Sequence, residues 1–282
     1  MINKRKLYIR SACLLLCLVM FVSASVAACA AGQPFPPCEK EYLVPPTPPE
    51  TESPQIEIPR PSFTDQIAEM HGRNSDTVGW LFVPNTSIDD VVVHYPHDAN
   101  EFYLRRNFDR RSSFSGVYFA DFRNTFDGTA SGLSRNTVIY GHSLNLNDDP
   151  DAPYFDQLKR FLSEDFARAN PYIFFSVAGE DLVWEIFAVY YATDRLPYNQ
   201  PNFTDEEFLA MLLEMTKRSE FIYDVEVGLE DRILTLSTCT YVFTPGVYPN
   251  KFRFVISARL VGEGEALRET AVLTRNPSPK DP

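Results

Sequence analysis

From residue 79 onward, short runs of apolar, β-branched and aromatic residues are interrupted by polar, turn-forming stretches, and such runs predict β-strands. Turn-forming residues separate eight such runs. The predicted strands are residues 79–83, 90–95, 116–120, 137–141, 173–177, 182–193, 233–238 and 252–260. Eight short strands with turns between them predict a mainly β fold, either a closed barrel or a sandwich.

Three other segments carry apolar residues at helical spacing. Residues 63–73 form a short amphipathic pattern with Thr64 as a candidate N-cap, and residues 155–168 form a second pattern. Residues 205–219 follow the candidate N-cap Thr204 and fall between the sixth and seventh predicted strands. We therefore expect a helix that packs on the sheet at this point.

The beginning of the chain predicts export. Residues 1–10 are basic, and residues 11–31 form an apolar run without a charged side chain, 21 residues long. This length and the preceding positive charge predict a single-pass anchor in the cell membrane, with the basic segment in the cytoplasm and the rest of the chain outside the cell. Two alternatives are a cleaved signal peptide and a lipoprotein processed at Cys29, which follows a row of small residues.

Composition divides the rest of the chain into three parts. Residues 32–61 contain ten prolines in thirty positions, which predicts an extended extracellular stalk with a reach of up to roughly 90 Å. Residues 62–262 hold all the predicted strands and form the candidate folded domain. Residues 263–282 are neither long nor apolar enough for a second membrane helix, and we expect a frayed, flexible tail.

The formal net charge is −12, and the basic residues 1–10 make the remainder more acidic still. An acidic body argues against nucleic acid and against anionic lipid as the main partner of the folded domain.

Candidate chemistry lies at the ends of three predicted strands. Cys239 is the only cysteine after Cys38, so the folded domain cannot contain an internal disulfide. His142 follows the strand at 137–141, and Arg253 stands near the start of the strand at 252–260. A thiol, an imidazole and a guanidinium in these positions predict a cysteine acyl-transfer site.

Five segments in the same order resemble the sortases, the cysteine transpeptidases of Gram-positive cell surfaces, and class B most of all. They are TLSTC at 235–239, NTVIYGH at 136–142, RFVISARL at 253–260, VGWL at 78–81 with TSID at 86–89, and YL at 103–104 with GVYFAD at 116–121. The resemblance extends from about residue 63 to residue 260. One departure is at residues 89–94, DDVVVH, where the family usually reads IDYPVVQ.

The resemblance implies a closed eight-stranded sortase-like barrel with an N-terminal helix and a helix between the sixth and seventh strands. It also implies that Cys239 is the nucleophile, His142 the general acid and base, and Arg253 the stabiliser of the oxyanion. Arg259 is a rival for the last role but lacks the motif position. No cofactor is implied.

In class B, the residues that match Asn100, Leu104, Tyr140, Ser237 and Thr240 line the substrate groove. Some relatives have glutamate at the position of Thr240, so the peptide preference of this chain can differ from theirs.

The expected partners are secreted proteins with a C-terminal sorting motif, cleaved after threonine. The acceptor is an amine of a peptidoglycan precursor or of a pilin lysine. One alternative is a hydrolytic cysteine protease that uses the same three residues with water as acceptor. Another is a non-catalytic surface lipoprotein that binds a ligand in the barrel groove.

Two polar segments imitate metal sites. His94 and His97 are separated by Tyr95 and a proline, and the sequence places no further candidate ligand beside them. Both features argue against a zinc site. Four residues alternate like calcium ligands: Asn145, Asn147, Asp149 and Asp151. The loop lacks the glycine at the turn position and the closing glutamate of a calcium-binding loop. We therefore expect no metal.

Overall fold

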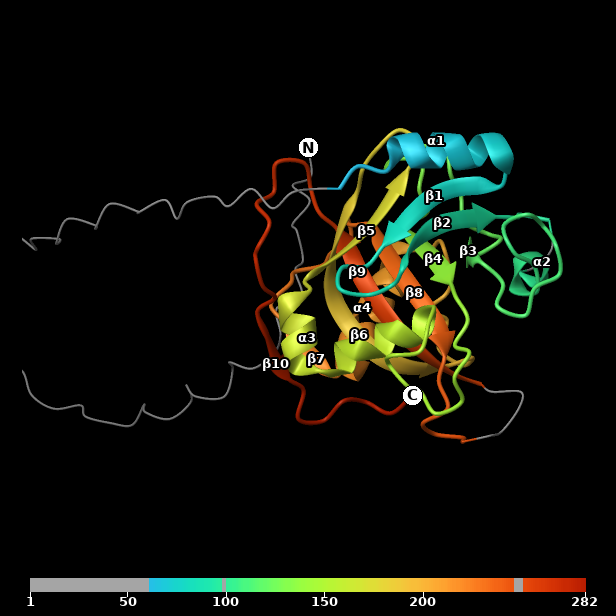
Figure 1. Cartoon of the computed structure of the whole chain (residues 1–282). Helices are drawn as coiled ribbons and strands as arrows, with labels where there is room; N and C mark the ends of the chain where they lie inside the picture. Colours follow the sequence, from blue (N-terminus) through green and yellow to red (C-terminus); the bar gives the residue numbers. More distant parts are fainter. Residues whose placement is uncertain (1–60, 98–99, 246–250) are drawn as a thin grey trace, which may run out of the picture. The chain divides into compact units, whose positions relative to one another are not determined.

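The structure is a computed structural model that describes residues 61–97, 100–245 and 251–282 (Figure 1). The predicted segments 1–10 and 11–31, with Cys29, lie outside these residues, as does the stalk at 32–61 apart from its last residue. Among the described residues, no helix is both long and apolar enough to cross a membrane.

Eight strands close into a barrel in the order β1-β2-β3-β4-β8-β9-β6-β5, so the predicted mainly β fold with a closed barrel is confirmed. The strands are β1 (Thr77–Phe82), β2 (Asp89–His94), β3 (Tyr118–Ala120), β4 (Asn136–Tyr140), β5 (Tyr172–Val177), β6 (Val183–Thr193), β8 (Ile233–Cys239) and β9 (Phe252–Leu260). Each strand matches one predicted run. Alternate side chains such as Leu236 on β8 and Ile256 on β9 fill the interior.

The pairing of three neighbouring strands brings their ends to one edge of the barrel. β4 and β8 are parallel, with Tyr140 opposite Ser237, so both strands end at the same edge. β9 is antiparallel to β8, so it begins where β8 ends, and Cys239 is paired with Arg253. This topology places the three sequence-predicted chemical groups at a common edge.

Two of the predicted helices are present on the barrel surface. Helix α1 (Thr64–Arg73) packs beside β1, but Phe63 holds its N-cap position and no side chain caps it, so the prediction of Thr64 as N-cap is wrong. Helix α4 (Asp205–Arg218) follows β6 and precedes β8 in the chain, as predicted. Thr204 caps it in a capping box with Glu207.

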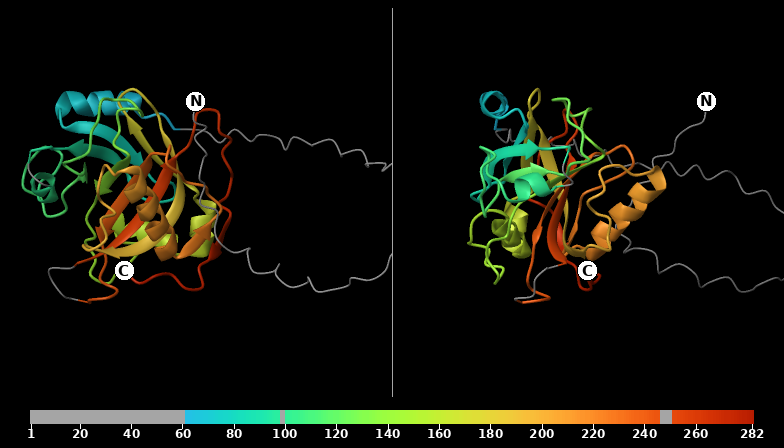
Figure 2. Two further views of the ribbon diagram at one scale, coloured as in Figure 1. Left: turned by 180° about the vertical axis from the view of Figure 1, so that it is seen from behind. Right: turned by 90° about the vertical axis from the view of Figure 1, so that its right-hand side faces the viewer.

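Helix α4 covers the outer face of β6, β8 and β9 (Figure 2). The helix buries four apolar side chains against this face: Phe208, Met211, Leu212 and Met215. The barrel contributes Tyr190, Ile233 and Val255 from three adjacent strands. The apolar stripe that predicted the helix is thus its packing face.

The predicted single helix at 155–168 is two elements. A 3-10 helix, η1 (Phe155–Leu162), is followed by the short α-helix α3 (Glu164–Ala169), whose N-cap is Ser163. The buried residues Phe155, Leu158 and Phe161 recur every three positions, which is the period of a 3-10 helix rather than that of an α-helix.

The segment at 263–282, for which the sequence predicts a frayed tail, returns to the folded domain. Its strand β10 (Leu273–Arg275) pairs with β7 (Phe221–Tyr223) in a separate two-stranded sheet. Ala271 and Leu273 are buried, and the Ala271 N–H donates to the carbonyl of Arg168. These apolar contacts and backbone hydrogen bonds hold the segment in place.

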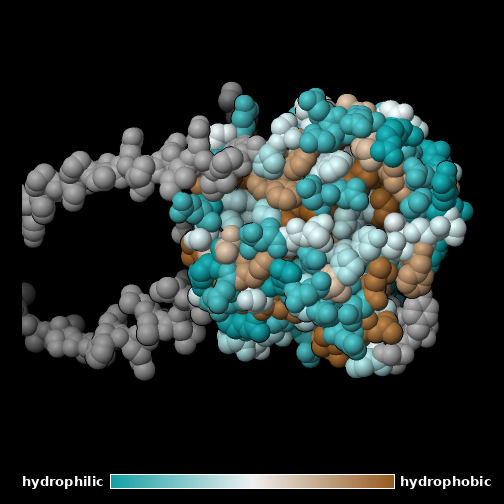
Figure 3. Space-filling view, viewed as in Figure 1, coloured by the Kyte–Doolittle hydropathy of each residue, from teal (hydrophilic) through white to brown (hydrophobic). Residues whose placement is uncertain are grey.

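Viewed as in Figure 1, the surface of the described residues is mainly hydrophilic with scattered apolar side chains (Figure 3). The large apolar side chains exposed on the described part of the chain include Phe114, Leu146, Val242 and Phe243.

Candidate active site

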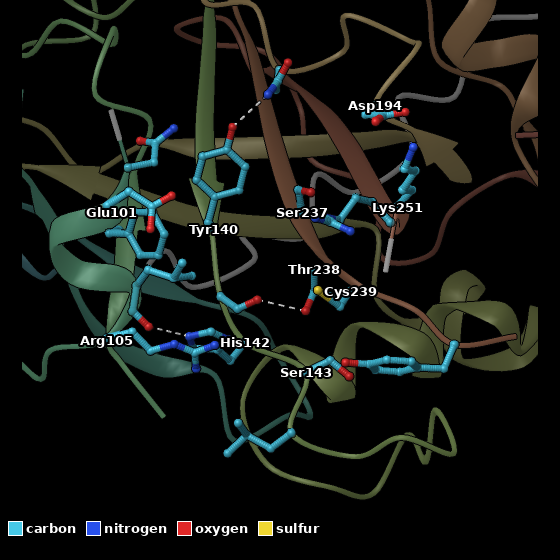
Figure 4. A pocket seen from close by; sticks show the side chains of 18 of the residues that line it. Glu101, Arg105, Tyr140, His142, Ser143, Asp194, Ser237, Thr238, Cys239 and Lys251 are labelled. Atoms are coloured by element: carbon cyan, nitrogen blue, oxygen red, sulfur yellow. Dashed lines mark hydrogen bonds between the residues drawn. The ribbon is translucent and has the colours of Figure 1, made fainter. Parts of the chain in front are cut away.

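A pocket of about 710 Å³ opens at the barrel edge where β4, β8 and β9 meet (Figure 4). The short helix α2 (Glu101–Leu104) forms another wall, and residues 194–199 after β6 add a third. Cys239, His142 and Arg253 all line this pocket. The structure therefore brings together the three residues that the sequence places on separate strands.

Cys239 is the last residue of β8, and its side chain is partly exposed. Leu234 and Leu236 point into the barrel core, so alternation turns Ser237 and Cys239 to the outer face. Cys239 is a free thiol. A partly exposed thiol at a pocket wall is accessible to a substrate, unlike a buried structural cysteine.

Arg253 is the register partner of Cys239 on β9. Directly opposite residues in an antiparallel pair have Cβ atoms about 5 Å apart and project from the same face. The alternation of β9 agrees, because Phe254 and Ile256 are in the core. The guanidinium of Arg253 also donates from Nη1 to the carbonyl of Phe252 at 2.9 Å.

His142 follows β4 and is held by helix α2. Its Nε2 lies 2.7 Å from the carbonyl oxygen of Leu104 (Figure 4). Since a carbonyl oxygen only accepts, Nε2 carries the proton, and Nδ1 is the proton-free nitrogen of the neutral ring. Burial lowers the pKa of His142 below its ordinary value of 6.5; the positive charge of Arg105 adds to this effect, and the Leu104 hydrogen bond opposes it. The imidazole is consequently neutral at pH 7.

Two glycines leave room for this histidine. Gly116 has a φ of +64°, and a Cβ there would approach Cδ2 of His142 to 3.1 Å. At Gly141, a Cβ would come within 2.6 Å of the Phe155 ring. A larger side chain at either position would displace the chain beside His142.

A buried carboxylate, Asp121, organises the wall that contains Asn100 and Tyr140. It accepts hydrogen bonds from Nδ2 of Asn100 at 2.9 Å and from the hydroxyl of Tyr140 at 2.8 Å. Arg123 pairs with both of its oxygens. Burial raises the pKa of Asp121, but the hydrogen bonds from Arg123, Asn100 and Tyr140 outweigh it, so the pKa lies below the ordinary value of 3.8.

Of the five predicted substrate-groove residues, four line the pocket: Asn100, Leu104, Tyr140 and Ser237. Ser237 contacts the hydroxyl of Tyr198 at 2.9 Å. Thr240 does not line the pocket. It is fully buried, and its hydroxyl donates to Asp148 at 3.0 Å.

Sequence reasoning missed several residues of this site. Tyr198, Asp194 and Lys251 line the pocket but lie in loops without a periodic pattern. Asp121 was visible only as the end of the GVYFAD segment, with no role attached to it. A signal for Asp121 is its position directly after the buried strand β3.

No three His, Cys, Asp or Glu side chains gather in a way that would hold a metal ion within residues 61–97, 100–245 and 251–282.

No protein-family model matches the sequence. Among curated proteins, sortase B of Listeria monocytogenes is 33% identical over 198 residues, which cover 70% of this chain and 74% of that protein. A solved Staphylococcus aureus sortase B–substrate complex has a TM-score of 0.60 and 29% identity, over 70% of this chain and 85% of the other. The X-ray structure of Clostridium perfringens sortase B has a TM-score of 0.58 and 32% identity, over 69% of this chain and 99% of the other.

Proposed function

Because this chain belongs to the class B sortases and is thus a cysteine transpeptidase by family, we propose that Cys239, His142 and Arg253 carry out its reaction. The observation that carries the proposal is the register pair of Cys239 and Arg253 at the wall of a pocket that His142 also lines. In this arrangement Cys239 is the nucleophile, His142 the proton carrier and Arg253 the oxyanion donor, all acting on one reacting carbonyl.

In the first half-reaction, the sulfur of Cys239 attacks the carbonyl carbon of a threonyl peptide bond. The carbonyl oxygen gains negative charge, and the guanidinium of Arg253 stabilises it by charge-assisted hydrogen bonds. The imidazole of His142 takes up the thiol proton and returns it to the leaving amine as the C–N bond breaks. The products are a thioester on Cys239 and a free amine.

The second half-reaction reverses these steps with a new amine. The incoming nitrogen attacks the thioester and loses a proton to His142. The C–S bond then breaks, and the proton passes to the departing sulfur of Cys239. Because Nε2 donates its proton to Leu104, we expect Nδ1 to carry out this proton transfer.

We expect the substrate to be the C-terminal sorting motif of a secreted protein, cleaved after threonine. Asn100, Leu104, Tyr140 and Ser237 are the proposed groove residues, and their place on the pocket wall supports this role. The acceptor is proposed to be an amine of a peptidoglycan precursor or of a pilin lysine.

Anchoring of the enzyme to the cell membrane by residues 11–31 is also a proposal, supported by their apolar and uncharged sequence. Fractionation of cells that express the full chain would test it. Retention in the membrane by both the natural chain and Cys29→Ala supports an apolar anchor. Release of Cys29→Ala alone would identify a lipoprotein instead.

The decisive experiment mixes the purified chain with a panel of sorting-motif peptides and a small amine, and follows products by mass spectrometry. We expect a peptide cleaved after threonine and joined to the amine, and no product with Cys239→Ala, whose fold should be unchanged. Cleavage without joining in the presence of several amines would favour the hydrolytic protease. The absence of any product, together with a Cys239 that no alkylating reagent labels, would favour the ligand-binding lipoprotein.

A further inference from the structure

The segment after His142 and the segment after Cys239 are joined by one carboxylate. Oδ2 of Asp148 accepts a hydrogen bond from the hydroxyl of Thr240 at 3.0 Å and another from the backbone N–H of Tyr241 at 2.6 Å. These two residues directly follow Cys239. Asp148 has a φ of 55°, in the left-handed region that aspartate adopts more readily than most residues other than glycine.

The other oxygen of Asp148 is paired with a buried lysine. Lys159, on η1, is 3% exposed and forms ion pairs with both Asp148 and Asp156. Its ammonium also donates to the hydroxyl of Ser143 at 2.9 Å. A buried ammonium is tolerated only when it is paired and hydrogen-bonded, and here two carboxylates and a hydroxyl surround it.

Asp156 fixes the residues that follow His142. It accepts from the hydroxyl of Ser143 at 2.5 Å and from the backbone N–H groups of Leu144 and Asn145 at 2.7 and 3.2 Å. Lys159 thus binds one carboxylate that holds the histidine side of the site and another that holds the cysteine side.

We propose that Asp148, anchored by Lys159 and Asp156, is a positioning residue that sets the separation of the Cys239 thiol and the His142 imidazole. The inference rests on the proposed function, since it concerns two residues assigned there to the reaction. Asp148, Asp156 and Lys159 are not among the residues that line the pocket. The cluster adds a link between two chain segments that are already joined by the pairing of β4 with β8 and by the hydrogen bond from the Thr238 hydroxyl to the Gly141 carbonyl.

This inference also gives Thr240 a role different from the one that the resemblance implies. Thr240 directs its hydroxyl inward to Asp148 instead of toward a peptide. A threonine here strengthens the link between the two segments, whereas a longer acidic side chain would place a third carboxylate beside Asp148 and Asp156. The expected effect of changing Thr240 is therefore on kcat rather than on peptide affinity.

The test compares Asp148→Ala, Asp148→Asn and Thr240→Val in the full chain. We expect Asp148→Ala to lower kcat on the order of 10²-fold with KM for the peptide unchanged, because misplacement of reacting groups by about 1 Å has this cost. Thr240→Val loses one hydrogen bond and should show a smaller fall of the same kind. Asp148→Asn keeps an oxygen for Thr240 and Tyr241 and leaves Lys159 paired with Asp156, so it should recover most of the activity.

Asp149→Ala is the matched control, because Asp149 is exposed on the same loop and, among the described residues, its carboxylate accepts only a local hydrogen bond from the N–H of Asp151. Its kcat should equal that of the natural chain. Thermal melting of each variant establishes that it is folded at the assay temperature. A folded Asp148→Ala or Thr240→Val with unchanged kcat, or with KM raised and kcat retained, overturns the proposal.

The rate at which iodoacetamide alkylates Cys239 provides a readout that does not depend on turnover. A nearby imidazole raises the reactivity of a thiol, so Asp148→Ala should approach the slower rate of His142→Ala, while Asp149→Ala should not. If the natural chain processes no peptide, the proposed function fails and this rate alone decides the positioning role. Equal alkylation rates in all of these variants overturn it.

Discussion

Cys239 and Arg253 are register partners at the open end of the β8–β9 pair. Their separation is fixed by strand pairing rather than by flexible loops, and their side chains project from the same face. An oxyanion donor is effective only when it is already in place before charge develops. The pairing of β8 with β9 holds Arg253 in place in this way. The same pairing explains why Arg253, and not Arg259, belongs to the pocket.

The first prediction concerns Arg253. Arg253→Ala should lower kcat by about 10²–10³-fold, the usual cost of losing one oxyanion donor. Arg253→Lys should retain part of the activity, because an ammonium keeps the charge but cannot present a planar pair of N–H groups. Steady-state kinetics with a sorting-motif peptide would measure both. Natural activity of Arg253→Lys would contradict a role for the planar pair of N–H groups, and natural activity of Arg253→Ala would contradict any role in stabilising the oxyanion.

The matched control for this prediction is Arg259, six positions further along β9. Arg259 forms ion pairs with the largely buried Glu185 and with Glu265, and it does not line the pocket. Arg259→Ala should cost roughly 3 kcal/mol of stability, the lower end for breaking a buried pair, because Glu265 is partly exposed. Its kcat should be unchanged at a temperature where it is folded.

The second prediction follows from the lowered pKa of His142. Burial and the charge of Arg105 both favour the neutral ring. If the neutral imidazole is the active form, kcat/KM should rise with pH along an acid limb that is centred below pH 6.5. Arg105→Gln removes a cation that opposes protonation, so it should raise the pKa and move this acid limb to higher pH.

Arg111→Gln serves as the comparison, because Arg111 is exposed and does not line the pocket. Its pH profile should coincide with that of the natural chain. An acid limb centred above pH 6.5 in the natural chain, or no movement in Arg105→Gln, would show that another group controls the rate.

The strands and the three chemical residues were predictable because their signals are local. Apolar, β-rich runs bounded by turn-forming residues identified all eight barrel strands, and TLSTC, NTVIYGH and RFVISARL identified the residues that share the pocket. The short elements α2, β7 and β10 lack an apolar run like the one around β3, and three or four residues are too few to show a period. The 3-10 helix was mistaken for an α-helix because i and i+3 spacing occurs in both.

The supporting polar contacts were not predictable from the sequence. Asp148 stands in a loop that resembles an ordinary solvated segment, yet it meets Thr240, a residue 92 positions away. Likewise, Asp121 joins Asn100 to Tyr140, and these belong to different elements. Buried polar networks depend on where the chain segments meet in space, and hydrophobic periodicity carries no information about this.

The third prediction concerns Gly141, which precedes His142. A Cβ at this position would lie 2.6 Å from the Phe155 ring, so Gly141→Ala requires the strand end or the ring to move. Overpacking of this kind costs about 1–3 kcal/mol, and the shift should also lower kcat by displacing His142. Thermal or urea unfolding and steady-state kinetics would measure the two effects.

Gly72→Ala is the paired control. Gly72 is near the end of α1, and a Cβ there would meet no atom within 4 Å. Alanine favours a helix over glycine by up to about 1 kcal/mol, so this variant should be neutral or slightly more stable. If Gly141→Ala were as stable and active as Gly72→Ala, the inference that Phe155 packs too closely against position 141 to admit a Cβ would be contradicted.

The last prediction uses the hydrogen bond from Tyr140 to Asp121. Tyr140→Phe removes a donor to this carboxylate and the acceptor for Asn199, while the ring can still pack against Phe119. We expect a loss of about 1 kcal/mol of stability at pH 7, because one hydrogen bond is removed. We also expect a raised KM, because the side chain at position 140 of the groove wall is no longer held by Asp121. Steady-state kinetics and thermal melting would measure both.

The pH dependence of this loss distinguishes the carboxylate from a general packing effect. The folded-state pKa of Asp121 is lowered, so its charged form contributes stability above the ordinary pKa of 3.8, and this contribution is lost as pH falls through the folded-state value. Tyr140→Phe weakens that contribution, so its deficit relative to the natural chain should be full at pH 7 and shrink below pH 3.8. Tyr95→Phe, whose ring stacks on Phe102, should show no such dependence. A deficit for Tyr140→Phe that stays constant down to the acid transition would mean that its hydroxyl does not act through Asp121.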